Sequence, residues 1–349
     1  MICEVNHGPD TSTRERDLKQ LNMELTQSFW DEVVEIDKQL RSRGKTLTKS
    51  KILERFDVSD TSARCISYAL KHRDIIIPQP RPVQQDGKKI KKRVFMGGDT
   101  HCGHMAGLTP SPFHLQLDHP KFDKFAIFQR ETWAWFENAI RKLQPFDIAV
   151  WNGDMIDGKG TRSGGSELLT PDRTVQVEMA TDIVNFVGAK KVVMTYGTPY
   201  HAGQEEDFEG LIATATGAVA IKDELNIDIE GVVFNVKHQT GSSSVPYSTA
   251  TAPLKDQLYQ ALWAEFEERE SADIVVRSHI HEYIQINNRR GSVIVLPALQ
   301  GAMTKFGGRR CVKLVDYGFA YVDIFTDGSY EIVPVRFKPE SQKSKVLVL

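Results

Sequence analysis

Carboxylate and imidazole side chains follow five predicted strands, at the point where each strand ends. They are Asp99 and His101 after residues 94–96, Asp154 after 148–151, His201 after 192–195, His238 after 232–236, and His279 with His281 after 274–276. Loops at the carboxyl ends of strands in an open α/β sheet converge on one crevice, so we expect these side chains to meet. Carboxylate oxygens and imidazole nitrogens together suit Mn, Fe, Zn or Ni. The sequence therefore predicts a metal site.

The spacing inside two of these motifs supports the same prediction. In an extended segment, residues i and i+2 point to the same side, so both members of Asp99-x-His101 and of His279-x-His281 can reach one ion. Any one motif alone is more typical of a surface loop or a turn. All five in order, each at a strand end, indicate a shared site. Glycines that permit tight turns border the motifs at Gly98, Gly153 and Gly197.

Residues 93–335 resemble the calcineurin-like metallophosphoesterases, which include phosphatases, nucleotide hydrolases and DNA-end nucleases. The resemblance is carried by the order of Asp99-x-His101, Gly153-Asp154-x-x-Asp157, Gly197…His201, His238 and His279-x-His281. It implies an α/β (α+β) fold, a four-layer αββα sandwich with a dinuclear metal centre. In such a centre two cations about 3.5–4 Å apart neutralise the phosphoester and hold a hydroxide between them.

The same resemblance implies a role for each matching residue. It implies metal ligands in two groups, with Asp99, His101 and His281 on the first ion, His238 and His279 on the second, and Asp154 shared by both. Asp154 and His201 would be the catalytic residues, and Asp157 and Asn152 would support the ligands from behind. The expected cofactor is two divalent ions, Mn²⁺ first, with Fe, Zn or Ni as alternatives.

One segment departs from the family pattern. The family has Gly-Asn-His, where Asn binds the second metal and His lies beside the leaving group; this chain has Gly197-Thr198-Pro199-Tyr200-His201. Thr198 takes the Asn position, where its hydroxyl is a poorer ligand than an amide oxygen. His201 is displaced by two residues. Three alternatives stay open: a bulged loop that returns His201 to the phosphate, a weakened second site, or help from Asn152 or Tyr200.

The elements that position these motifs alternate along the chain. Helical patterns over residues 122–143, 173–187, 205–216 and 254–270 separate the strands named above, which argues for β-α-β units and a buried sheet. After His281 the helices stop, and residues 283–286, 292–296, 311–325 and 330–337 predict antiparallel strands. A length of 349 residues fits about two domains.

The region before residue 94 has a different composition. We expect a flexible arm over 1–24, a helix-turn-helix-like domain over 25–75, a Pro-rich basic linker over 76–93, the phosphoesterase domain over 94–340 and a tail over 341–349. Between residues 41 and 93 there are 15 Lys/Arg and 5 Asp/Glu, although the whole chain carries −2. Two short helices joined by a turn are typical of DNA binding but also of a plain helical bundle. The candidate nucleic-acid contacts are Lys49, Lys51, Arg64, Lys71 and Arg73.

Composition excludes several classes of protein. With 40% hydrophobic and 26% charged residues, the chain is neither disordered nor fibrous. No apolar run approaches the ~18–20 residues that span a bilayer, and residues 1–16 lack the apolar core of a signal peptide. Four scattered cysteines indicate reduced thiols rather than a disulfide framework. We expect a cytoplasmic protein, of a kind that would suit a phage or mobile element.

Three functions fit these features. The first is a metal-dependent phosphodiesterase, a DNA or RNA nuclease whose N-terminal domain binds the polyanion. The second is a phosphatase of phosphoproteins or small phosphorylated molecules, with the helices contacting a partner. The third is a DNA-binding regulator with weak catalysis, because the second metal site is eroded at Thr198.

Overall fold

The chain divides into two compact units, Met1–Asp86 and Gly87–Leu349. The structure is a computed structural model, and the residues it describes are 32–33, 35–37, 39–40, 47–58, 63, 66–67, 88–116, 120–160, 163–202, 206–243, 245, 248–266, 271–302 and 314–342.

Short helical segments make up the described part of the first unit. Helix α3 (Lys49–Arg55) lies within the predicted helical domain and buries Ile52. The described residues between 32 and 40 are helical, as the spacing of Val33 and Ile36 predicts, and both side chains are buried. Lys49 and Lys51 lie on α3. The predicted arm 1–24, the tail from 343 onward and three candidate DNA contacts lie outside the described residues: Arg64, Lys71 and Arg73.

The larger unit contains two sheets. The first has the order β11-β10-β1-β2-β3-β4. Its strands are β1 (Ile90–Gly97), β2 (Ile148–Asn152), β3 (Lys191–Thr195), β4 (Ala220–Lys222), β10 (Tyr317–Phe325) and β11 (Tyr330–Phe337). Strands β1, β2, β3 and β4 run parallel to one another, whereas β10 pairs antiparallel with both of its neighbours, β1 and β11. The parallel strands therefore deliver their carboxyl ends to one edge.

Strand β1 corrects the predicted boundary of the linker. The strand begins at Ile90, so residues 90–93, assigned to the basic linker, belong to the sheet. Arg93 makes a bidentate pair with Asp323 of β10, with both N···O distances 2.7 Å. Its charge is therefore used inside the fold, and the basic run there is part of a paired strand rather than a solvated spacer.

The second sheet packs face to face against the first. Its order is β5-β6-β7-β9-β8, formed by β5 (Glu224–Ile229), β6 (Val232–Lys237), β7 (Ile274–Arg277), β8 (Ile284–Asn288) and β9 (Gly291–Val295). Alternate residues of both sheets form one buried cluster, including Val94 and Val150 from the first, and Phe234, Val276 and Ile294 from the second. Inward-facing apolar residues at a period of two are the expected pattern for such a layer.

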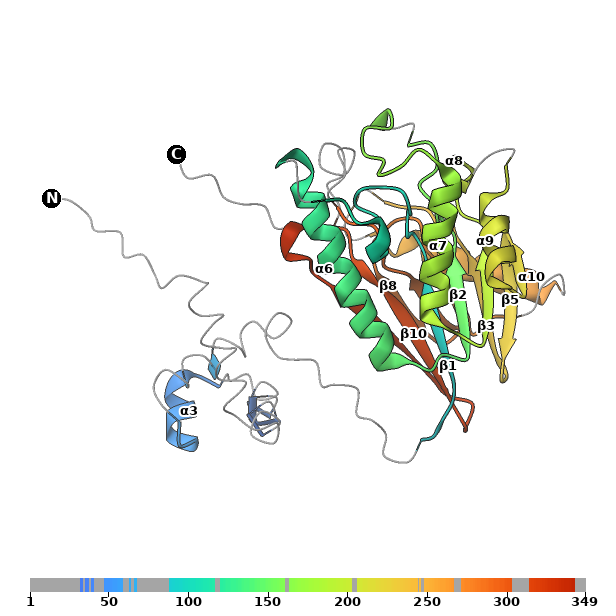
Figure 1. Cartoon of the computed structure of the whole chain (residues 1–349). Helices are drawn as coiled ribbons and strands as arrows, with labels where there is room; N and C mark the ends of the chain where they lie inside the picture. The colour runs from blue at the N-terminus through green and yellow to red at the C-terminus, as the bar shows by residue number, and fades with distance from the viewer. Residues whose placement is uncertain are drawn as a thin grey trace. The chain divides into compact units, whose positions relative to one another are not determined.

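Helices cover the outer faces. In Figure 1, α6 (Pro120–Leu143) and α7 (Arg173–Val187) lie across the first sheet, and they share a buried cluster with Phe95, Trp151 and Phe319. Helix α10 (Thr251–Glu265) contacts β7 and β9 on the second sheet. The layers are therefore helix, sheet, sheet, helix, and the expected αββα sandwich is confirmed.

The described ranges of this unit contain four further short elements. They are η1 (Ser111–Phe113), α8 (Pro199–Ala202), α9 (Phe208–Thr216) and η4 (Glu340–Gln342). None of the helices in the described ranges combines the length and hydropathy that a bilayer-crossing segment requires.

Candidate metal centre

The five predicted motifs lie together where β1, β2, β3, β6 and β7 end. Three overlapping groups of carboxylates and imidazoles have ligand atoms within 4.8 Å of one another: Asp99, His101 and His281; His101, Asp154 and His201; and Asp154, His238 and His279. His101 and Asp154 each belong to two groups. The structure thus joins residues up to 182 positions apart in the sequence into one chain of donors.

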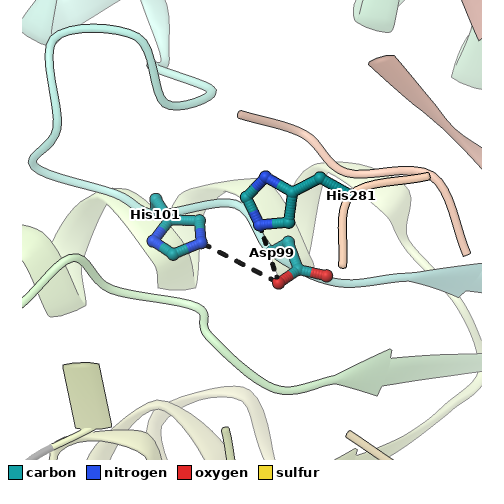
Figure 2. A group of neighbouring side chains, drawn as sticks. All are labelled: Asp99, His101 and His281. Atoms are coloured by element: carbon teal, nitrogen blue, oxygen red, sulfur yellow. Dashed lines mark ion pairs between the residues drawn. The ribbon is translucent and has the colours of Figure 1, made fainter. Parts of the chain in front are cut away.

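The carboxylate of Asp99 lies at the centre of the first group, as Figure 2 shows. Its Oδ1 is 3.2 Å from Nε2 of His281 and 3.8 Å from Nε2 of His101. It also lies 3.9 Å from Nε2 of His238, which in turn is 3.1 Å from Oδ2 of Asp154. Imidazole nitrogens from three different loops therefore surround one carboxylate oxygen.

Three buried atoms of this cluster lack the hydrogen-bond partners that a bound cation would replace. Within the described part of the chain, Oδ1 of Asp99 and Nε2 of both His101 and His238 are buried and make no hydrogen bond. A buried polar atom without a partner costs roughly 1–3 kcal/mol, so such atoms are rare unless a ligand satisfies them. All three face the same cluster. A divalent cation with oxygen and nitrogen ligands would supply the missing partner to each.

Backbone strain is concentrated at the same residues. Among the described residues, six that are not glycine have φ between 45° and 76°. Five of them are at the site: Asp99, His101, Asp154, His279 and His281. Left-handed conformations at such residues cost on the order of 1–3 kcal/mol each and persist where the surrounding structure imposes them. The loops are held in a geometry that brings ligand atoms together at a cost in stability.

Two of the flanking glycines are required by close packing. A Cβ on Gly153 would lie 2.6 Å from Nδ1 of His238, and its φ is +74°. A Cβ on Gly197 would clash with the backbone nitrogen and Oδ1 of Asp154. Larger residues would separate the loops after β2, β3 and β6, so these glycines set the distance between ligands.

Asp157 and Asn152 hold the imidazoles from behind. Oδ1 of Asp157 is 3.2 Å from Nδ1 of His101, and the main-chain oxygen of Asn152 accepts a 2.6 Å hydrogen bond from Nδ1 of His238. In both rings Nε2 is left to face the cluster, which is the usual arrangement of metal-binding histidines. The Asn152 amide donates to Ser278 Oγ at 2.8 Å and accepts from Thr195 at 2.6 Å. The Asn152 side chain is therefore occupied as a support.

The segment that departs from the family pattern folds back toward the site through α8. This one-turn helix includes the two extra residues, and it places a ring nitrogen of His201 in one group with His101 and Asp154. Thr198 donates its N–H and its hydroxyl to Asp154 Oδ1 at 2.6 and 3.0 Å. The loop therefore bulges and brings His201 back to the donor groups, and its role toward a substrate stays a prediction.

Glu209 is a residue that the motif analysis missed. It lies fully buried on α9, where Oε1 accepts from Met155 N–H at 3.0 Å and Oε2 accepts from Gly197 N–H at 2.7 Å. One carboxylate thus joins the loop after β2 to the loop after β3. The available signal was the acidic residue at the start of a predicted helix, but nothing in the sequence showed that it points inward.

Burial and neighbouring charge shift the pKa values of the cluster in opposite directions. Burial lowers the pKa of His101, but the hydrogen bond to Asp157 and the nearby carboxylate of Asp99 raise it to about 10. The pKa of His238 is likewise raised to about 10, because the carboxylate of Asp154 outweighs burial. The imidazoliums in turn hold the pKa values of Asp99 and Asp154 below the usual range despite burial. Burial lowers the pKa of His201 to about 4, helped by the neighbouring charge of His101.

Comparisons with known proteins give similarity at the level of structure. No protein-family model and no curated protein sequence matches the chain. Among solved structures, a Zn²⁺ complex of Vps29 from Entamoeba histolytica is 15% identical and covers 70% of this chain and 99% of its own, with a TM-score of 0.34. A novel archaeal phosphodiesterase is 12% identical over 70% and 99%, with a TM-score of 0.37. A predicted phosphoesterase from Streptococcus pneumoniae is 12% identical over 70% and 98%, with a TM-score of 0.30.

Proposed function

We propose that this chain is a calcineurin-like metallophosphoesterase, a hydrolase of phosphoester bonds that uses two divalent cations. The observation that supports this most directly is the pair of donor groups, Asp99–His101–His281 and Asp154–His238–His279. Nε2 of His238 connects them, since it lies near the carboxylates of both Asp99 and Asp154. Three buried atoms without hydrogen-bond partners lie in these two groups: Oδ1 of Asp99 and Nε2 of His101 and His238. Mn²⁺ is the proposed cation, and Zn²⁺, Fe²⁺ and Ni²⁺ are the alternatives compatible with this donor set.

Each residue of the site has a role in this proposal. Asp99, His101 and His281 would hold one cation, His238 and His279 would hold the other, and Asp154 would be shared by both. When bound, the two cations would supply Lewis-acid activation of the phosphoryl group and of water. Thr198 donates two hydrogen bonds to Asp154 and so fixes the orientation of the shared carboxylate. Its hydroxyl hydrogen points at that carboxylate, which makes Thr198 a positioning residue.

Hydrolysis of a panel of p-nitrophenyl phosphate mono- and diesters tests the proposed activity. The full chain is freed of metal with a chelator and assayed with Mn²⁺, Zn²⁺, Ni²⁺, Fe²⁺ or Mg²⁺. We expect turnover that requires an added transition metal and that is lost in Asp154→Asn. Glu206→Gln, an exposed carboxylate paired with Arg173 on the surface, is the matched control and should keep full activity. Equal turnover in wild type and Asp154→Asn would refute the proposal.

We further propose that the substrate is a nucleic-acid phosphodiester. The support is the excess of Lys and Arg in the first unit, with ten against five Asp and Glu between residues 41 and 86, since a basic segment raises the local concentration of a polyanion. The test measures release of labelled nucleotides from single- and double-stranded DNA and RNA, with the full chain and with the unit Gly87–Leu349. Removal of the first unit should weaken hydrolysis of the polymer and flatten its salt dependence, and leave p-nitrophenyl diester hydrolysis unchanged.

The same assays separate the two alternatives. A preference for monoesters, with no cleavage of nucleic acid by either form, would identify a phosphatase. DNA binding by the full chain without measurable turnover on any ester would identify a regulator. Either result would overturn the nuclease proposal.

A further inference from the structure

His201 reaches the proposed cation site through the segment that departs from the family pattern. Helix α8 (Pro199–Ala202) carries it, and its side chain is 17% exposed. The ring stands nearly perpendicular to that of His101, with centroids 4.5 Å apart and an interplanar angle of 84°. One His201 ring nitrogen lies within 4.8 Å of donor atoms of His101 and Asp154. His201 thus meets the same 4.8 Å limit as the members of the other two groups.

The proton on the His201 ring is located by its hydrogen bond. Nδ1 lies 2.9 Å from the carbonyl oxygen of Asp157, and a carbonyl can only accept, so Nδ1 carries the hydrogen. In the neutral ring Nε2 then has a lone pair and no proton. His238 shows the same arrangement, with Nδ1 2.6 Å from the carbonyl oxygen of Asn152. Metal-binding histidines commonly donate their other N–H in this way.

We propose that His201 is a direct ligand, through Nε2, of the cation that His101 and Asp154 contact, an inference that rests on the proposed two-cation centre. A ring that donates through Nδ1 to a carbonyl oxygen can offer the lone pair of Nε2 to a cation, as metal-binding histidines commonly do. The two inserted residues, Pro199 and Tyr200, form α8 together with His201 and Ala202, and so add a nitrogen donor to the group of His101 and Asp154.

An extra imidazole changes the preference among metals. Imidazole suits Zn²⁺ and Ni²⁺ better than the oxygen-preferring Mn²⁺, and affinity generally rises from Mn²⁺ through Co²⁺ to Ni²⁺. Removal of His201 should therefore weaken Zn²⁺ and Co²⁺ binding more than Mn²⁺ binding. A residue that contacts only the substrate would change none of these affinities.

Cobalt titration of the full-length chain tests the assignment without any substrate. Metal-free wild type, His201→Ala, His201→Gln and the control His114→Ala are titrated with Co²⁺. The control histidine is hydrogen-bonded to Thr109 carbonyl oxygen at 2.9 Å, outside the three donor groups. Visible absorption reports the ligand set, competition with a chelator gives the affinity, and proton NMR shows the paramagnetically shifted N–H signals of cobalt-bound rings.

The expected result has three parts. Both His201 variants lose at least about tenfold in affinity for one of the two Co²⁺ ions. The absorption spectrum of that ion changes. The variants also lack one shifted N–H signal, that of the His201 Nδ1–H, which donates to the carbonyl oxygen of Asp157. Circular dichroism confirms that the variants are folded, and His114→Ala matches wild type. Unchanged affinity, spectrum and N–H signals in folded His201 variants would overturn the inference, even where turnover falls. Wild type that binds no Co²⁺ would instead refute the proposed metal centre.

Discussion

Replacement of Glu209 by glutamine should change how the stability of the metal-free protein depends on pH. The carboxyl is fully buried and joins the loops at Met155 and Gly197. Burial, helped by the negative charge of Asp154, raises the pKa of Glu209 from 4.5 to about 7. Between these two values the folded protein binds a proton that the unfolded chain releases.

The sign and size follow from that difference. A raised carboxyl pKa gives stability that is present below about pH 4.5 and is lost as pH rises through 7. A shift of about 2.5 units corresponds to on the order of 3 kcal/mol, of which roughly 2–3 kcal/mol falls between pH 5 and pH 8. Glutamine has no such titration. It also has only one oxygen for two N–H donors, so it loses one hydrogen bond, worth about 1–3 kcal/mol, at every pH.

Urea unfolding of both proteins at pH 5 and pH 8, with chelator present, measures the effect. Four of the five tryptophans lie within residues 87–349 and report that unit by fluorescence. Glu209→Gln should be the less stable protein at pH 5, and the gap should narrow by roughly 2–3 kcal/mol at pH 8. Glu206→Gln, whose carboxyl pKa is lowered by Arg173, should show no narrowing. A constant gap between wild type and Glu209→Gln at the two pH values would refute the reasoning.

Three further outcomes follow from the structure. Asp154→Asn should lose bound metal in elemental analysis, because the shared carboxylate belongs to two donor groups; a full complement of two ions would contradict this. Because His101 and His238 have pKa values near 10 in the metal-free site, each should release a proton when a cation binds at pH 7–8, and affinity should fall as pH is lowered. Calorimetry in buffers of different ionisation enthalpy counts the released protons, and a count of zero would contradict this prediction. Phe95→Ala, which empties a buried ring position between Trp151 and Phe319, should cost about 3–5 kcal/mol in denaturant unfolding; a loss below about 1 kcal/mol would contradict it.

The sequence predicted the elements that carry strong periodicity. Helix α7 was predicted with both ends correct, and the five strands that end at the motifs were found within a few residues, since buried parallel strands are short apolar runs. Strands β4 and β5 were missed. They are partly exposed, and sequences such as Glu224–Ile229 mix charged and apolar residues, so their pairing is decided by neighbouring strands. The linker boundary was wrong because basic side chains in β1 are neutralised by partners distant in sequence, such as Asp323.

The residues of the candidate site likewise divide into those that local sequence patterns predict and those that only the packing reveals. Residues in motifs, such as Asp99 and His281, were predicted because their spacing and position at strand ends can be recognised locally. The return of His201 through α8 was one of three open alternatives, since the conformation of the Thr198–His201 loop depends on contacts with Asp154 and Asp157. Glu209 gave only a weak signal, an acidic residue early in a predicted helix, because its function depends on which face of α9 is buried. Position along the chain shows which groups can act, and only the packing shows which of them do.

The concentration of strain at the site leads to a final prediction, that cations stabilise the fold. Five left-handed residues at on the order of 1 kcal/mol or more each, with three buried atoms lacking partners, represent a cost comparable to the whole stability of a domain. Cations that bind only the folded state offset it by about 2.7 kcal/mol for each site at one hundred times the dissociation constant. Thermal unfolding of the metal-free chain should therefore shift upward with added Mn²⁺ or Zn²⁺. Asp99→Asn, which retains the size of the side chain but removes its charge, should respond much less. An equal rise in both proteins would show that the cations act elsewhere, and no rise in wild type would show that the strained loops are stable without them.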